Sequence, residues 1–121
     1  MVKFIATDLD GTLLDGERRL PEEIFPLIAK LKELGVLFAP ASGRQYANLK
    51  KLFEPVADDV LFICENGALI KYRGKTLHCH PIGNRYLKEA LDEIRALPHL
   101  YPMLCGTEYA YIENSEMPFF K

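Results

Sequence analysis

Two aspartates separated by one residue follow the first strand-like run, and this arrangement constrains the fold more than any other feature. Residues 4–7 favour a strand, and Asp8-Leu9-Asp10-Gly11-Thr12 comes directly after them. Because strand side chains alternate between faces, Asp8 and Asp10 would point to the same side. Two neighbouring carboxylates repel each other unless a cation or a proton lies between them, and Mg²⁺ takes such oxygen ligands. The motif therefore predicts a Mg²⁺ site at the end of an N-terminal strand.

Length, charge and cysteine content restrict the class of protein. The chain has 121 residues, 49% of them hydrophobic, which is enough for one compact domain but not for two complete ones. Its formal charge is −2 and it has no basic block, so we expect no nucleic-acid partner. With neither a signal peptide nor a membrane-spanning run, we expect a cytoplasmic location and no membrane partner. Three widely spaced cysteines predict reduced, mostly buried thiols.

Apolar runs and helical patterns alternate over the first half of the chain. A helix is expected from Pro21, with Ile24, Leu27, Ile28 and Leu31 on its apolar face, up to Gly35. Strands are expected at 36–39 and 60–64, and a second helix at 44–53. This β-α-β-α-β order predicts a parallel sheet covered on both faces, with ligands at the carboxyl ends of its strands. Asp15-Gly16 predicts a turn that closes a flap-like hairpin over the first strand.

The pattern changes after Asn66-Gly67. Short alternating strands are expected at 68–73 and 76–80, around the turn at Arg73-Gly74. A helix should follow from about 85 to 97, with Asn84 as its N-cap. The expected apolar face of that helix consists of Leu87, Ala90, Leu91 and Ile94. Residues 101–105 and 109–112 favour two further strands.

Three motifs at the ends of the first three strands resemble one enzyme family. They are Asp8-Leu9-Asp10-Gly11-Thr12, Ala41-Ser42-Gly43-Arg44 and Glu65-Asn66-Gly67-Ala68. Together they resemble the haloacid dehalogenase superfamily of phosphohydrolases, and more closely its Cof-type branch of sugar-phosphate phosphatases with a type IIB cap. The resemblance implies an α/β fold with a Rossmann-like, three-layer α/β/α parallel sheet. Residues 1–82 would form the N-terminal part of the core domain and residues 83–121 the beginning of an α/β cap.

The resemblance also implies a role for each motif residue. Asp8 would attack phosphorus and form an aspartyl-phosphate, while Asp10 would act as general acid and base. Mg²⁺ would be held by the Asp8 carboxylate and the Asp10 backbone carbonyl. The substrate would be a small phosphorylated metabolite. The residues expected to contact it or to shape its site are Gly11, Thr12, Ser42, Gly43, Arg44 and Asn66.

The likeness covers the N-terminal half of a family member. The family's downstream lysine and its Gly-Asp-x-x-x-Asp motif do not occur in these 121 residues. We therefore expect an incomplete chain that binds Mg²⁺ weakly and has little activity. A sheet that ends after its third parallel strand would leave the first strand with an unpaired edge, which favours self-association.

Other functions fit parts of the same pattern. A receiver-like phosphoacceptor module also uses acidic residues beside a parallel sheet, but it accepts phosphate after the third strand, where this chain has Cys64-Glu65-Asn66. A non-catalytic, self-associating fragment is a further alternative, motivated by the aromatic pair Phe119-Phe120. His78 and His80 could form a metal pair, although a packed or solvated strand explains them better. Tyr101, Tyr109, Tyr111 and the phenylalanine pair are interpreted as core and edge packing.

Overall fold

The computed structural model describes residues 1–113, and these form parts of two compact units. The first unit is Met1–His80 and the second begins at Pro81. The sequence analysis placed the boundary between residues 82 and 83. That the two units are a core and the beginning of a cap remains a prediction.

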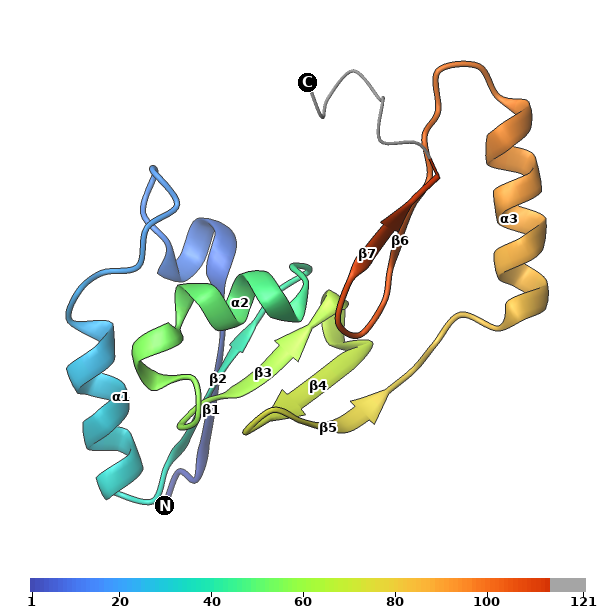
Figure 1. Ribbon diagram of the computed structural model, residues 1–121. Coiled ribbons are helices and arrows are strands. Elements are labelled where there is room, and N and C mark those ends of the chain that lie inside the picture. Colours follow the sequence, from blue (N-terminus) through green and yellow to red (C-terminus); the bar gives the residue numbers. More distant parts are fainter. Residues whose placement is uncertain (114–121) are drawn as a thin grey trace. The chain divides into compact units, whose positions relative to one another are not determined.

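The first unit contains a five-stranded mixed sheet with the order β1-β2-β3-β4-β5 (Figure 1). The first three strands are parallel, and β4 and β5 extend the sheet as an antiparallel hairpin. This confirms the predicted α/β class and the two short strands around Arg73-Gly74. The strands are β1 (Phe4–Asp8), β2 (Leu37–Ala41), β3 (Leu61–Cys64), β4 (Leu69–Tyr72) and β5 (Lys75–Cys79).

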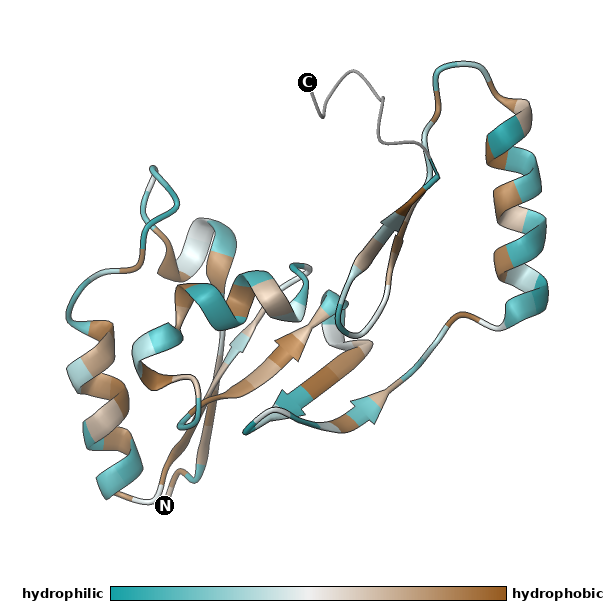
Figure 2. Ribbon diagram, viewed as in Figure 1, coloured by the Kyte–Doolittle hydropathy of each residue, from teal (hydrophilic) through white to brown (hydrophobic). Residues whose placement is uncertain are grey.

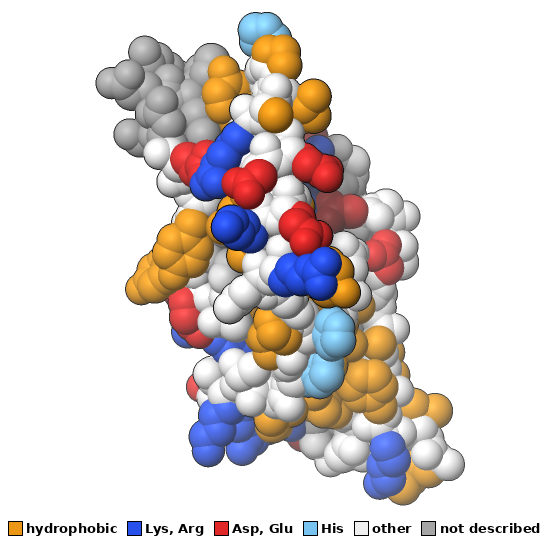
Figure 3. All heavy atoms as spheres, turned by 90° about the vertical axis from the view of Figure 1, so that its right-hand side faces the viewer, with side chains coloured by type: hydrophobic (Ala, Val, Ile, Leu, Met, Phe, Trp, Pro, Cys, Tyr) orange, Lys and Arg blue, Asp and Glu red, His pale blue; other side chains and the backbone are white. Residues whose placement is uncertain are grey.

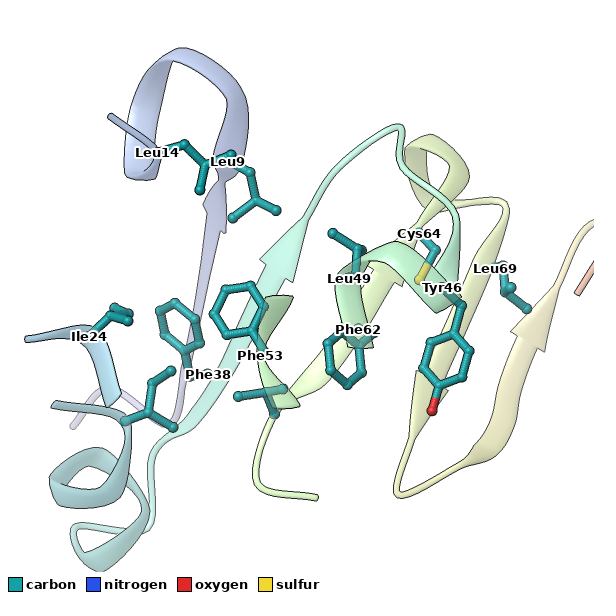
Figure 4. Close-up of a cluster of buried hydrophobic side chains, with 12 residues drawn as sticks. Leu9, Leu14, Ile24, Phe38, Tyr46, Leu49, Phe53, Phe62, Cys64 and Leu69 are labelled. Atoms are coloured by element: carbon teal, nitrogen blue, oxygen red, sulfur yellow. The ribbon is translucent and has the colours of Figure 1, made fainter. Parts of the chain in front are cut away.

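Two helices follow the first two strands and pack on the same face of the sheet. Helix α1 (Ile24–Glu33) contacts β2, and α2 (Tyr46–Leu52) contacts β3. Both helices contribute to one buried cluster with Phe38, Phe53 and Phe62 (Figure 4). The Phe53 and Phe62 rings meet edge to face, with their centroids 6.3 Å apart, which is a favoured aromatic geometry. The core of the first unit therefore lies between these helices and one side of the sheet.

The opposite face of the sheet is less covered. Along β3 and β4, fully buried residues alternate with partly exposed ones, as expected when one face is better packed than the other. The register pairs Leu61 with Tyr72 and Ile63 with Ile70, and all four are only partly buried. Strand β3 is nevertheless hydrophobic along its whole length, whereas β4 is hydrophobic only in its first half (Figure 2). The sequence analysis expected cover on both faces, whereas both described helices of this unit pack on one.

Among residues 1–113, strand β1 lies at the edge of the sheet and pairs only with β2. Its apolar side chains are exposed, including Phe4 at 47% and Ile5 at 36%. An apolar edge strand presents free backbone donors and acceptors to any further strand. The structure thus has the unpaired edge that the sequence predicted.

The second unit contains α3 (Asn84–Ala96) and a hairpin of β6 (Met103–Cys105) and β7 (Ala110–Ile112). Acidic and basic side chains alternate over the exposed face of α3 (Figure 3). None of its described residues is fully buried, and on α3 Leu87, Leu91 and Ile94 are only partly buried. The apolar face expected for this helix is therefore only half covered by residues 81–113.

The tyrosines of the second unit correct one expectation. The sequence analysis interpreted these side chains as core and edge packing. Tyr101, Tyr109 and Tyr111 are 46%, 70% and 59% exposed, so the core part of that interpretation is wrong. The physical reason is that the described part of this unit has only one helix and one hairpin, too few layers to enclose an aromatic ring. Phe119 and Phe120 lie outside the described residues.

Element boundaries differ from the sequence predictions at all three helix starts, and the second helix begins at Tyr46 and not at residue 44. Pro21 was expected to open the first helix, but the helix begins at Ile24, whose N–H donates to the Pro21 carbonyl in a preceding turn. Asn84 was expected as an N-cap but is the first helical residue, and Gly83 takes the cap position. Helix starts are the least regular part of the pattern, because several nearby residues can satisfy the first N–H groups.

The cysteines are less buried than expected. Cys64 is buried, whereas Cys79 and Cys105 are exposed, and none of the three forms a disulfide. Within residues 1–113, no helix is long and apolar enough to cross a membrane. The cytoplasmic location stays a prediction.

We predict that the purified chain self-associates through the β1 edge. Its apparent mass in light scattering should rise with concentration, because the exposed edge offers unpaired hydrogen-bonding groups beside apolar side chains. Phe4→Lys should reduce the association, whereas Leu34→Lys, a matched change at an exposed residue beyond α1, should not. A monodisperse monomer at all concentrations, with two-state unfolding in denaturant, would contradict this expectation.

We also predict that the three thiols differ in reactivity. Burial raises the pKa of the Cys64 thiol to about 11, so little thiolate exists at pH 8. A thiol reagent at that pH should label Cys79 and Cys105 rapidly and Cys64 only after unfolding in urea. Cys64→Ala should remove the slow phase and leave the fast phase unchanged; rapid modification of all three native thiols would show that Cys64 is accessible.

Candidate functional site

The carboxyl ends of β1 and β2 bring together the first two sequence motifs. Asp8, the last residue of β1, pairs in register with Ala41, the last residue of β2, and Ser42 follows directly. Since the two strands are parallel, their polar ends meet at one edge of the sheet. A pocket of about 300 Å³ opens there, lined by Asp8, Ala41, Ser42, Gly43, Ile63, Asn66 and Gly67.

The chain leaves β1 through a single turn, η1 (Leu9–Leu13). Gly11 adopts a left-handed φ of +79°, a conformation that glycine tolerates without a steric penalty. Leu9 is completely buried, while Asp8 and Asp10 on either side of it are exposed. The Thr12 hydroxyl donates to Asp8 Oδ2 over 3.0 Å and so fixes the orientation of this carboxylate.

Asp10 lies beyond the end of the strand and forms an ion pair with Arg44. Arg44 Nε donates to Asp10 Oδ2 at 3.0 Å, and Nη2 donates to Oδ1 at 2.6 Å. Hydrogen bonding to the guanidinium is the main cause that lowers the pKa of Asp10 below its ordinary value. The sequence analysis expected Arg44 among the residues that contact the substrate or shape its site, whereas here its charged group is engaged by Asp10.

The loop after β2 is clamped by the turn η3 (Glu65–Gly67) that follows β3. The Asn66 N–H donates to the Ser42 carbonyl at 3.1 Å, and the Glu65 N–H donates to the Arg44 carbonyl at 3.2 Å. The Ser42 hydroxyl accepts from the Arg44 N–H at 3.2 Å. Glu65 and Asn66 have left-handed φ values, 51° and 55°, that are strained for residues other than glycine. This strained turn holds Asn66 against the loop that carries Ser42 and Gly43.

Gly43 is required for this close approach. A Cβ atom at position 43 would lie 3.0 Å from Asn66 Oδ1 and 3.2 Å from Nδ2. Without a side chain, the Gly43 backbone can approach both Asn66 and a ligand in the pocket.

A second hollow, of about 370 Å³, lies on the Asp10 side of η1. It is lined by Asp10, Gly11, Leu14, Asp15, Gly16 and Arg18. The predicted reversal at Asp15-Gly16 is present, because the Asp15 N–H donates to the Arg19 carbonyl and the Arg18 N–H donates to the Asp15 carbonyl. The segment has no assigned strands, so it is a tight turn rather than a regular hairpin.

The structure brings together half of the predicted site residues in the first pocket: Asp8, Ser42, Gly43 and Asn66. Asp10 and Gly11 line the second hollow, Thr12 supports Asp8, and Arg44 contacts Asp10. The sequence analysis missed Gly67 and Arg18. Gly67 belongs to a motif that was already identified, whereas no local pattern singled out Arg18.

The other candidate residues do not join the site. His78 and His80 are exposed, and residues 1–113 contain no group of three or more His, Cys, Asp or Glu side chains that could hold a metal ion. Asp59, which precedes β3, forms an ion pair with Lys32 at 2.6 Å.

Gly43→Ala should displace Asn66 from the pocket wall. The added methyl meets the end of a flexible side chain, so we expect a loss in unfolding free energy below about 1 kcal/mol, as for most mild substitutions. Phosphate affinity should nevertheless fall, measured by chemical-shift titration. Gly43→Ala combined with Asn66→Ala should recover the native backbone shifts around position 43. Unchanged Asn66 side-chain shifts in the single variant would disprove the contact.

Arg44→Gln should raise the pKa of Asp10 toward its ordinary value of 3.8, measured by carbon NMR. A lowered pKa in the folded state means that the ion pair stabilises the fold above pH 3.8 and that this stabilisation is lost as pH falls through the lowered value. Arg19→Gln removes a nearby arginine that pairs with Asp15 and should leave the Asp10 titration unchanged. An Asp10 titration that is identical in wild type and Arg44→Gln would rule out the pair in solution.

The chain is similar to known proteins, and it spans less than half of the length of those described below. The chain is 29% identical over 111 residues to the 5-amino-6-(5-phospho-D-ribitylamino)uracil phosphatase YbjI of Escherichia coli, covering 91% of this chain and 41% of that protein. A crystal structure from Eubacterium rectale superposes with a TM-score of 0.86 at 30% identity, covering 98% of this chain and 46% of that one. A haloacid dehalogenase-like hydrolase from Bacillus subtilis gives 0.78 at 25% identity, with 93% and 40% coverage.

The resemblance inferred from the three motifs is thus confirmed by both sequence and fold. Residues 5–120 match the family described as haloacid dehalogenase-like hydrolase. This match includes all three strand-end motifs and extends into the second unit. The chain therefore belongs to the haloacid dehalogenase-like hydrolase family.

Proposed function

We propose that this chain carries the nucleophile half of a phosphatase that hydrolyses small phosphomonoesters through an aspartyl-phosphate. The observation that supports this most directly is the first pocket. The pocket is lined by the Asp8 carboxylate, the nearly buried Ser42 hydroxyl, the Gly43 backbone and the Asn66 side-chain amide. A phosphoryl group can fit between them. They come from three successive strand ends of a parallel sheet, where ligands of such folds bind.

In this proposal Asp8 is the nucleophile. Thr12 holds Oδ2, so Oδ1 is the atom offered to phosphorus. A bond forms from Oδ1 to phosphorus as the bond to the leaving oxygen breaks, and Asp10 gives that oxygen a proton. Asp10 then takes a proton from water as the water attacks phosphorus and releases Asp8. The Ser42 hydroxyl and the Gly43 N–H would donate to the phosphoryl oxygens.

The residues at this site also fit a Mg²⁺ ion in their chemistry. Mg²⁺ binds few protein oxygens and keeps several waters. The Asp8 carboxylate faces the pocket, and since Arg44 engages the Asp10 carboxylate, Asp10 would contribute its backbone carbonyl. When bound, the ion would reduce the repulsion between Asp8 and a phosphate dianion. With so few donors in residues 1–113, we expect weak Mg²⁺ binding by this chain alone.

The substrate class and the extent of the activity are also part of the proposal. The similar Escherichia coli protein is named for a phosphorylated metabolite, which supports a small phosphomonoester substrate. Residues 83–113 would form the beginning of the cap. Because the chain spans less than half of these relatives, we expect little turnover from it alone.

A second candidate is a non-catalytic fragment that associates with another chain. The exposed β1 edge favours this possibility. Deleting residues 117–121 tests the earlier suggestion that the terminal aromatic pair drives association; an unchanged apparent mass would exclude that segment.

Asp8→Asn should abolish covalent phosphorylation. Brief treatment of the chain with a small phosphodonor and Mg²⁺, followed by mass-spectrometric mapping, should place the phosphoryl group on Asp8. Asp10→Asn should still be labelled but lose the label more slowly, because hydrolysis lacks its base. Label on Glu65 or another residue after β3 would favour the receiver-like alternative, and robust steady-state phosphatase activity would overturn the expectation of low turnover.

A further inference from the structure

The charge of the first pocket is unfavourable for the phosphoryl ligand that we propose. The pocket is lined by one carboxylate and by no lysine or arginine side chain. A phosphoryl group that enters beside Asp8 brings further negative charge. Because like charges in close contact cost free energy, a cation must accompany or meet this ligand.

Arg44 is a cationic residue that directly follows Gly43, one of the residues that line the pocket. Its backbone N–H donates to the Ser42 hydroxyl, and its carbonyl accepts from the Glu65 N–H. These two hydrogen bonds hold the Arg44 backbone in place directly after Gly43, which lines the pocket. Its side chain is 27% exposed, so part of it is open to solvent.

Asp10 already occupies the edge of the guanidinium that would bind an oxyanion. Nε and Nη2 each donate to a different oxygen of the same carboxylate. This forked arrangement is also how arginine binds phosphate in two-point contact. Asp10 and a phosphate ion are therefore competitors for the same donors.

Release of Asp10 from this pair would serve the proposed chemistry. Both Asp10 oxygens accept hydrogen bonds from Arg44, and Asp10 does not line the first pocket. Release from Arg44 would free the Asp10 carboxylate to approach a leaving oxygen in that pocket.

We propose that Arg44 is exchanged between Asp10 and the phosphoryl group: it holds Asp10 in the ligand-free protein and transfers to the phosphoryl oxygens when the pocket fills, releasing Asp10. This inference rests on the proposed function and gives Arg44 two roles, because it positions Asp10 in the ligand-free protein and contacts the phosphoryl group in the complex. Asp10 is then a built-in competitor that keeps the guanidinium ordered until an oxyanion displaces it.

A double-mutant cycle with inorganic phosphate tests the exchange, using the 121-residue chain in EDTA and calorimetric or chemical-shift titration. Asp10→Asn removes the competing charge and should tighten phosphate binding about two- to fivefold, the range of an exposed ion pair. Arg44→Gln should weaken binding. In the Arg44→Gln background, Asp10→Asn should increase phosphate affinity much less, because the guanidinium N–H groups for which Asp10 and phosphate compete are absent.

Asp15→Asn is the matched control. Asp15 lies in the neighbouring turn, carries the same charge and pairs with a different arginine, Arg19. Its replacement should change phosphate affinity much less than Asp10→Asn. The Arg44 Nε–H resonance provides a second readout, and it should shift when phosphate is added to wild type.

The outcomes separate the inference from the proposed function. Phosphate binding by wild type that Asp10→Asn weakens or leaves unchanged would overturn the exchange but leave the pocket as a phosphate site. Equal gains from Asp10→Asn and Asp15→Asn would also overturn it, since general charge repulsion would then explain both. If no variant binds phosphate, the exchange and the proposed function both fail.

Discussion

The parallel pairing of β1 with β2 is the interaction on which the site depends. It sets Asp8 beside Ala41, so the turn that carries Asp10 and the loop that carries Ser42 leave the sheet at the same edge. Parallel strands must be joined by a crossover, and α1 supplies it while packing on the core face. A one-residue slip would turn Asp8 toward the opposite face and empty the pocket of its carboxylate.

The electrostatics of the site follow from this geometry. The two aspartates are close in sequence but have different surroundings, since Asp8 faces the pocket with Thr12 while Asp10 faces Arg44. Such a difference allows neighbouring carboxylates to take different chemical roles. The same arrangement leaves the pocket walls without a positive side chain, which is why a metal ion and a mobile guanidinium both enter the proposed chemistry.

The less covered face of the sheet in the first unit contributes residues to the candidate site. The pocket includes Ala41 and Ile63, which point to the less covered face of the sheet. The edge strand that ends in Asp8 is also the exposed one. A polypeptide that packed against this edge and face would therefore lie next to the site. The relatives are more than twice as long as the part that they share with this chain, so they contain additional polypeptide.

The sequence by itself determined the order of the elements and the residues at the strand ends. Apolar runs and turn residues are local signals, and parallel strands bring their ends together, so Asp8, Ser42, Gly43 and Asn66 could be placed at one pocket in advance. Only the tertiary structure decided that Arg44 binds Asp10, 34 residues away, and that the tyrosines of the second unit are exposed. Those outcomes depend on which side chains lie within reach and which layers cover them, and neither is encoded in a local pattern.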